Sequence, residues 1–265
     1  MKRALKIGAA VLALLLILGL GVVANGLLGN PVSKALAKRS IQAYIDETYP
    51  DQELVLERVG YNFKNGDYFG YVVQPGSQDV HFSVNTDGLG RVRYDDYAYT
   101  VANRFNTYQR IEDSYRAITD PVLESLPGYD FGYGSLACDE GKAGEHEFAL
   151  PMSELELDGE YDVCTIGSQI GVLIVYMNDA DVSVQRAAEL LTMLRSKMDE
   201  AAVPFRKVEL TLWHPKTEEG YLDPQQVYAH LLYEELEPDG LPERVEQSNA
   251  AVQENYRQMD KENKP

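Results

Sequence analysis

The sequence predicts an α+β protein in which an N-terminal transmembrane helix precedes two small domains. Three observations lead to this fold class. Residues 7–28 contain no charged side chain and a single polar one. Apolar and polar residues then alternate over 54–99, with Asn-Gly and Asp-Gly turn dipeptides inside the run. Over 170–212 an apolar run, an amphipathic helical stripe and an alternating run follow one another, which is typical of a β-α-β unit.

The N-terminal stretch, within residues 1–29, is long enough to cross a bilayer. At about 1.5 Å per residue, Ile7–Leu28 forms a helix of roughly 33 Å, and the hydrocarbon core is about 30 Å thick. Lys2, Arg3 and Lys6 precede it, and the positive-inside rule keeps them in the cytoplasm. We therefore expect a single-pass protein of the cell membrane with a cytoplasmic N-terminus and the bulk of the chain outside.

A cleaved secretory signal is the alternative interpretation of the same stretch. Val22 and Ala24 are small enough for a cleavage site, and the charged start fits the first part of a signal peptide. Because the hydrophobic part of a signal peptide is usually shorter than this one, we favour the retained anchor over secretion.

The charge of the chain argues against nucleic acid as a partner. The sequence has 24 Lys and Arg against 42 Asp and Glu, a net charge of −18, and phosphate backbones would repel it. Residues 31–265 retain 21 basic and 42 acidic side chains, so the part expected outside the cell carries −21. This acidity fits solubility and repulsion from anionic lipid, whereas recruitment of cations or of a basic partner is the alternative.

The first domain, residues 30–126, is expected to contain a helix, an antiparallel meander and a second helix. Asn30 and Pro31 are typical of a helix N-cap and first helical position, and Tyr49 marks the end of this helix. The turn dipeptides predict hairpins between neighbouring strands. The expected strands are 54–63, 68–73, 80–84 and 91–99.

A helical stripe from Val101 to Val122 closes the first domain, and Pro121 should kink or restart this helix. The glycine-rich segment 127–147 is predicted to be the interdomain boundary, with a short hairpin around Tyr129–Cys138.

The second domain, residues 148–240, is expected to contain the β-α-β unit, with Ser183 capping its helix. A short helix or an edge strand should follow Asp223, and residues 241–265 read as a polar C-terminal helix or tail. The expected elements are a strand at 170–177, a helix at 184–198, and strands at 208–212 and 227–232.

Few residues qualify as site candidates. The four histidines lie far apart, and none has metal-ligand spacing to a second ligand; the sequence also lacks metalloprotease, hydrolase, Walker and dinucleotide signatures. We therefore predict no cofactor and no metal. The candidate ligand-binding residues are Tyr94, Asp95, Asp96 and Tyr97, with His81 in the strand 80–84. Because adjacent strand residues point to opposite faces, paired catalysis by Asp95 and Asp96 is not expected.

Cys138 and Cys164 are the only cysteines. Outside the cell they could close a disulfide that stabilises the fold by roughly 3.5 kcal/mol in the loop-entropy model. Two free buried thiols are the alternative.

Short motifs spread along the chain are similar to those of one known family. In the first half they are Gly29-Asn30-Pro31-Val32-Ser33, Tyr49-Pro50, Val59-Gly60-Tyr61-Asn62-Phe63-Lys64, Asp79-Val80-His81-Phe82, Tyr94-Asp95-Asp96-Tyr97 and Asn106-Thr107-Tyr108. In the second half they are Tyr161-Asp162, Asp181-Val182-Ser183-Val184, Met198-Asp199, Val203-Pro204-Phe205 and Glu243-Arg244-Val245-Glu246. The chain thus resembles the YfjL-like family of membrane-anchored proteins of Gram-positive bacteria. The resemblance implies two domains in an extracytoplasmic setting, and it implies no catalytic or binding residue.

These features predict a membrane-anchored, acidic, extracytoplasmic protein with a non-catalytic binding or regulatory ectodomain, whose partner is a protein or an envelope ligand. Two alternatives are kept. One is a hydrolase of envelope material that uses Asp95, Asp96 or His81, and the other is a cation-binding acidic surface.

Overall fold

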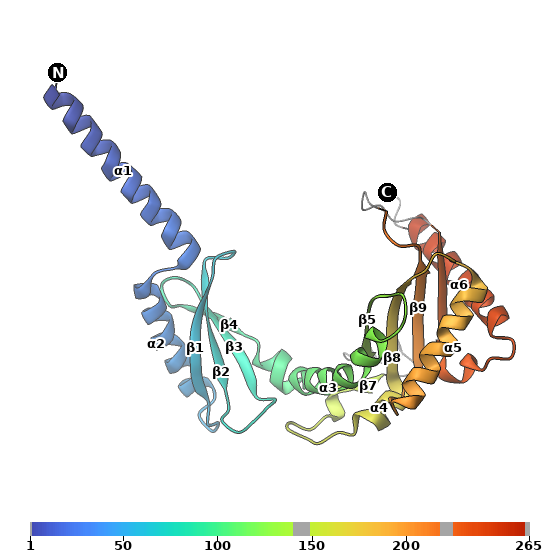
Figure 1. Cartoon of the computed structure of the whole chain (residues 1–265). Coiled ribbons are helices and arrows are strands. Elements are labelled where there is room, and N and C mark those ends of the chain that lie inside the picture. Colours follow the sequence, from blue (N-terminus) through green and yellow to red (C-terminus); the bar gives the residue numbers. More distant parts are fainter. Residues whose placement is uncertain (1, 140–148, 218–224, 263–265) are drawn as a thin grey trace. The chain divides into compact units, whose positions relative to one another are not determined.

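The computed structural model describes residues 2–139, 149–217 and 225–262 (Figure 1). The chain divides into two compact units. Unit 1 is Met1–Thr107 with Glu156–Asp158, and unit 2 is Tyr108–Leu155 with Gly159–Pro265. Each unit has its own cluster of buried apolar side chains. Helices occur together with a four-stranded antiparallel sheet, a four-stranded mixed sheet and a two-stranded parallel one, which confirms the predicted α+β class.

Unit 1 begins with two helices, α1 (Lys2–Leu28) and α2 (Pro31–Thr48). Among the described residues, one helix near the N-terminus is long and apolar enough to cross a membrane, judged by length and composition, and its apolar window is wholly exposed. The Asn30 side chain accepts a hydrogen bond from the Ser33 N–H at 2.7 Å, and Pro31 occupies the first turn of α2. The predicted N-cap is therefore confirmed.

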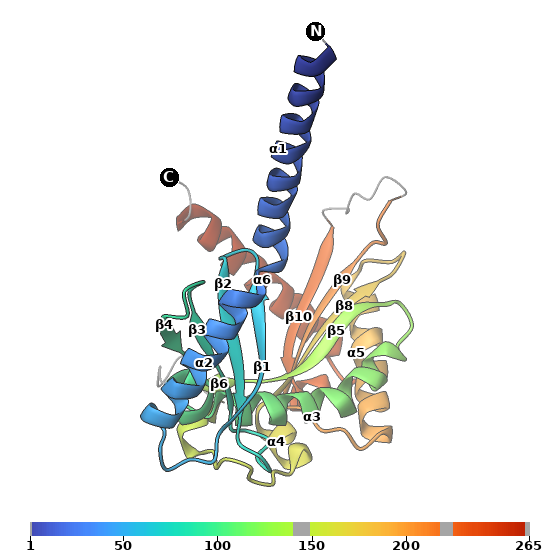
Figure 2. The same cartoon turned by 90° about the vertical axis from the view of Figure 1, so that its left-hand side faces the viewer.

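The sheet of unit 1 is the predicted antiparallel meander, and α2 packs against it (Figure 2). Apolar residues of α2, among them Ile41 and Ile45, form a core with Val72, Phe82 and Val84 of the strands. The strands, in sheet order, are β1 (Val55–Asn62), β2 (Asp67–Val73), β3 (His81–Thr86) and β4 (Val92–Asp95).

β4 is shorter than the predicted strand 91–99. A turn of π-helix, Ala98–Ala102, follows it instead. The Asp96 carbonyl accepts hydrogen bonds from both the backbone N–H and the hydroxyl of Thr100, each at 2.8 Å. These bonds curl the chain away from the sheet, so the strand cannot continue.

Unit 2 contains a four-stranded mixed sheet of order β10-β9-β8-β5. Its strands are β5 (Tyr129–Leu136), β8 (Gly171–Asn178), β9 (Lys207–Trp213) and β10 (Gln226–Leu232). β8 and β9 are parallel and are joined by α5 (Val184–Glu200), which confirms the predicted β-α-β unit. The Ser183 side chain caps α5, as expected. The remaining elements are α3 (Phe105–Glu124), β6 (Cys138–Asp139), β7 (Leu150–Pro151), the 3₁₀ turns Met152–Glu154 and Tyr233–Leu236, α4 (Val163–Ile170) and α6 (Leu241–Glu262).

The glycine-rich segment differs from its prediction. Residues 129–136 form one strand, β5, which pairs with β8 rather than folding into a hairpin. At Gly134 the backbone of β5 packs closely against Thr119. Any larger residue would clash there, because a Cβ at this position would lie 2.2 Å from the Thr119 Oγ1. Residues 140–148, which make up much of the predicted boundary, lie outside the described residues.

The compact units also divide the chain at other places than the predicted ranges 30–126 and 148–240. Leu123 and Leu126, at the end of α3 and just beyond it, belong to the core of unit 2. The helix runs without a break through Pro121 to Glu124. The expected restart at Pro121 therefore does not occur. The predicted turn at Asp223 lies outside the described residues.

Candidate functional site

The two predicted carboxylates lie in unit 1, but they take different partners. Asp95 Oδ2 accepts hydrogen bonds from the hydroxyls of Tyr44 at 2.6 Å and Tyr49 at 2.9 Å. Asp96 Oδ1 accepts instead from the Ser83 backbone N–H at 2.6 Å. Both carboxylates therefore join segments of unit 1, and the structure does not bring the two together as an acid–base pair.

His81 and Asp95 point to opposite faces of the sheet. Asp95 pairs with Val84 across the β3–β4 ladder and shares its face, and Val84 belongs to the core that α2 covers. His81 is three positions from Val84 in the same strand, and side chains alternate along a strand. The His81 ring lies 5.7 Å from that of Tyr71. His81 and Asp95 therefore do not meet on one face of the sheet, and the ligand-binding role predicted for these residues stays a prediction.

The two predicted tyrosines differ from each other in environment. The Tyr97 ring lies 4.6 Å from that of Tyr49 and 5.1 Å from that of Phe82, in a half-buried aromatic cluster. Burial raises the pKa of the Tyr49 hydroxyl above its ordinary value of 10.0, so Tyr49 remains a hydrogen-bond donor at neutral pH. Tyr94 is 59% exposed. The aromatic cluster stabilises unit 1, whereas Tyr94 lies on the surface of unit 1.

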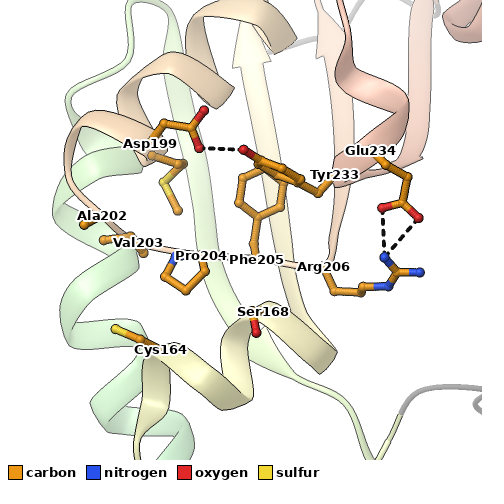
Figure 3. Close-up of a pocket in the computed structure, with 11 residues that line it drawn as sticks. Cys164, Ser168, Asp199, Ala202, Val203, Pro204, Phe205, Arg206, Tyr233 and Glu234 are labelled. Carbon is orange, nitrogen blue, oxygen red and sulfur yellow. Dashed lines mark hydrogen bonds and ion pairs between the residues drawn. The ribbon is translucent and has the colours of Figure 1, made fainter.

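Unit 2 contains a pocket of about 470 Å³ that no sequence pattern indicated (Figure 3). Three separate segments line it. They are α4 with Cys164 and Ser168, the end of α5 and the residues after it (Met198, Asp199 and 202–206), and the 3₁₀ turn with Tyr233 and Glu234. The three segments lie apart in the sequence, and nothing in their linear order shows that they meet.

The turn after α5 forms the floor of the pocket. Ala202 has φ +54°, and the Val203 N–H donates to the Met198 carbonyl at 2.9 Å, as at many helix ends. Pro204 follows, and its carbonyl accepts a hydrogen bond from the Tyr115 hydroxyl at 2.9 Å. The buried side chains of Met198 and Val203 make this floor apolar.

Polar groups at the rim of the pocket pair with one another, as Figure 3 shows. The Tyr233 hydroxyl donates to Asp199 Oδ1 at 2.9 Å, while its ring packs edge-on against Phe205 with 5.2 Å between centroids. Arg206 Nη1 contacts both carboxylate oxygens of Glu234, at 3.0 and 2.8 Å. An apolar floor with a few oriented polar groups suits a small amphipathic ligand.

Cys164 is the nucleophilic side chain at this pocket. Its thiol is free and exposed, and its N–H donates to the Asp162 side chain that caps α4. None of the described residues that line the pocket is a histidine, and the carboxylates of Asp199 and Glu234 are engaged with Tyr233 and Arg206. The lining therefore offers no free base to activate the thiol.

The described part of the chain holds no group of three or more His, Cys, Asp or Glu side chains that could bind a metal ion. The predicted disulfide stays a prediction. Only the backbone of Cys138, in β6, lies within the described structure, so the pairing of the two cysteines is not tested. The Cys164 thiol is unbonded and exposed in the structure, unlike the buried thiol of the alternative.

Residues 3–96 match the YfjL-like, N-terminal domain family. The resemblance predicted from the motifs is thereby confirmed for α1 and most of unit 1. No curated protein matches the chain significantly. Among solved structures, a DUF5037 family protein from Ruminococcus gnavus ATCC 29149 is 10% identical, and the match covers 73% of this chain and 89% of that chain with a TM-score of 0.22. A TM-score this low supports no argument about fold or function.

Proposed function

We propose that this chain, whose first 96 residues include a YfjL-like N-terminal domain, is an extracytoplasmic ligand-binding protein held in the membrane by α1. One observation carries the anchoring. The apolar window of α1 is wholly exposed, whereas each unit buries a core of its own. Such a helix is unfavourable in water and stable in hydrocarbon, because its backbone groups are already paired. The basic residues 2, 3 and 6 favour a cytoplasmic N-terminus.

Cys164 provides a test of this topology, because its thiol is exposed on unit 2. The Cys138→Ser variant is expressed in a Gram-positive host, and a membrane-impermeant maleimide is added to intact or to lysed cells. We expect equal labelling in both. The variant that also carries Cys164→Ser measures background. Labelling that requires lysis would place unit 2 in the cytoplasm and contradict the proposal.

The ligand is proposed to bind in the pocket of unit 2. Its volume of about 470 Å³ lies in the range of small-molecule sites, about 300–1,000 Å³. The apolar floor would hold the body of an amphipathic envelope molecule, and the Arg206–Glu234 pair at the rim would orient its polar end. The paired state of the rim groups favours binding over catalysis.

A pocket-filling variant tests this site. Ser168→Trp places an indole at the mouth of the pocket from an exposed position of α4, and Gln169→Trp is the matched control because Gln169 is exposed but does not line the pocket. The full chain is purified from its native membrane in mild detergent and analysed by native mass spectrometry. We expect a bound species on the wild type and on Gln169→Trp that is lost from Ser168→Trp. Retention in Ser168→Trp, or a bare wild type, would refute the pocket as the binding site.

A further inference from the structure

Two hairpin tips of unit 1 carry exposed apolar side chains. The β1–β2 turn presents Phe63, which is 59% exposed, and the β3–β4 turn presents Leu89, which is 69% exposed. In an antiparallel meander of order β1-β2-β3-β4, the first and third turns lie at the same end of the sheet. The β1–β2 turn lies beside the last turn of α1 (Figure 1). The two apolar tips therefore belong to the end of the sheet that meets α1.

Close contacts fix this end of the sheet against the end of α1. The Tyr61 hydroxyl donates to the Gly26 carbonyl at 3.0 Å, and the Asn30 N–H donates to the Tyr68 hydroxyl at 2.7 Å. Gly29 has φ +69°, and a Cβ there would lie 2.6 Å from the Tyr68 hydroxyl and 2.8 Å from the Tyr61 ring. These contacts determine the level along α1 at which the tips lie.

That level coincides with the point where α1 would leave the hydrocarbon. The apolar stretch begins at Ile7, and at about 1.5 Å per residue the stretch from Ile7 to Gly26 covers about 30 Å, the thickness of the hydrocarbon core. Tyr61, bonded to Gly26, then lies in the interface, where tyrosine is enriched in membrane proteins. Phe63 and Leu89, on the adjoining turns, lie near the same depth.

Basic side chains surround the two tips. Lys64 lies next to Phe63, and the side chains of Arg91 and Arg93 are 76% and 55% exposed. Each arginine has a carboxylate partner, Asp87 at 2.6 Å and Asp67 at 3.6 Å, which leaves this surface with an excess of one positive charge. Both arginines also line a cavity of about 420 Å³ at the end of α1.

The units differ in their compatibility with an anionic surface. Outside the apolar helix, unit 1 has 8 basic and 12 acidic side chains, a net charge of −4, and unit 2 has 13 and 30, a net charge of −17. Anionic lipid would repel unit 2 far more strongly than unit 1. The partner that fits the tips is therefore a lipid surface rather than a protein, because the tips adjoin the helix that enters the bilayer.

We propose that Phe63 and Leu89 insert into the outer interface of the membrane that α1 spans, with Lys64, Arg91 and Arg93 directed to lipid phosphates. The inference rests on the proposed anchoring by α1. Apolar and aromatic side chains flanked by basic ones bind the interface in this way. Unit 1 would then lie against the bilayer at a fixed orientation instead of moving freely on a tether.

Brominated lipids, which quench tryptophan on contact, provide the test. The full chain is reconstituted into vesicles of phosphatidylcholine and phosphatidylglycerol with brominated or ordinary acyl chains. The variants are Phe63→Trp, Leu89→Trp and, as control, Tyr99→Trp, an exposed aromatic position beyond the far end of β4. The wild type, with Trp213 as its single tryptophan, gives the background.

We expect blue-shifted emission that is quenched by brominated lipid for Phe63→Trp and Leu89→Trp, and no quenching for Tyr99→Trp. Weaker quenching in vesicles of phosphatidylcholine alone would show the contribution of the basic residues, and equal quenching would assign the contact to the apolar tips. The inference is overturned if the chain floats with the vesicles but Phe63→Trp or Leu89→Trp is not quenched, or if Tyr99→Trp is quenched equally. In either case the anchoring by α1 still stands. If the chain does not float with the vesicles, the anchoring itself fails.

Discussion

Asp95, a candidate site residue, joins a helix to a strand in unit 1. Its carboxylate receives the hydroxyls of Tyr44 in α2 and Tyr49 just after it, and it lies at the end of β4. The carboxylate raises the pKa of the Tyr44 hydroxyl through their hydrogen bond, so the phenol stays a donor. A charge-assisted pair of hydrogen bonds of this kind links a helix to a strand that is distant in the sequence.

We expect Asp95→Asn to lower the free energy of unfolding by about 1–2 kcal/mol, because a neutral amide accepts hydrogen bonds more weakly than a carboxylate. Urea unfolding followed by circular dichroism measures the change. Asp46→Asn is the control, since Asp46 is an exposed carboxylate on α2 and its replacement should stay within about 0.5 kcal/mol of the wild type. Equal stability of the two variants would mean that Asp95 has no structural role.

Among the elements, β10 and α6 show how the edge of the second sheet is closed. β10 pairs with β9 on one side only. On its other side, the Tyr228 N–H donates to Asn249 Oδ1 at 3.0 Å and the His230 N–H donates to Ser248 Oγ at 2.8 Å. An uncovered edge strand invites pairing with another chain. The polar face of α6 thus replaces the missing strand.

Replacing both Ser248 and Asn249 by alanine should leave the amides of Tyr228 and His230 without acceptors. Each unsatisfied donor costs about 1–3 kcal/mol, so the hydrogen-exchange protection of these two amides should fall relative to neighbouring positions of β9. Gln247→Ala, at an exposed position of the same helix, should leave protection unchanged. Unaltered exchange in the double variant would show that α6 does not seal this edge.

The whole molecule combines an exposed apolar helix with two units that have separate cores. The net charge is unevenly distributed between the two units, because the acidic excess is concentrated in unit 2. The exposed apolar window of α1 is the observation on which the proposed anchoring rests. The last turn of α1 also contacts unit 1, through Gly26 and Tyr61, so α1 is continuous with the folded part.

Intact mass measured on the membrane fraction distinguishes an anchor from a cleaved signal. We expect a chain that retains α1, because the proposed anchoring depends on the exposed apolar window of this helix. A species lacking about the first 24 residues, cleaved after Ala24, would contradict the anchor. Deletion of residues 2–24 is the matched control and should shift the protein to the soluble fraction.

The sequence by itself determined the elements whose signals are local. The apolar run of α1, the Asn30-Pro31 start of α2, the turn dipeptides of the meander and the cap at Ser183 each depend on neighbouring residues alone. Local signals therefore located these elements. The end of β4 and the continuity of β5 were mispredicted, because the first depends on the hydrogen bonds of Thr100 and the second on pairing with β8, a strand distant in the sequence.

Only the tertiary structure decided which side chains meet. It placed His81 and Asp95 on opposite sheet faces, engaged Asp95 with two tyrosines, and joined Cys164, Val203 and Tyr233 around one pocket. These residues come from segments separated by tens of positions, and backbone periodicity carries no information about contacts at that range. The sequence thus determined the apolar N-terminal helix and the order of the elements, whereas long-range packing decided the geometry of the candidate site.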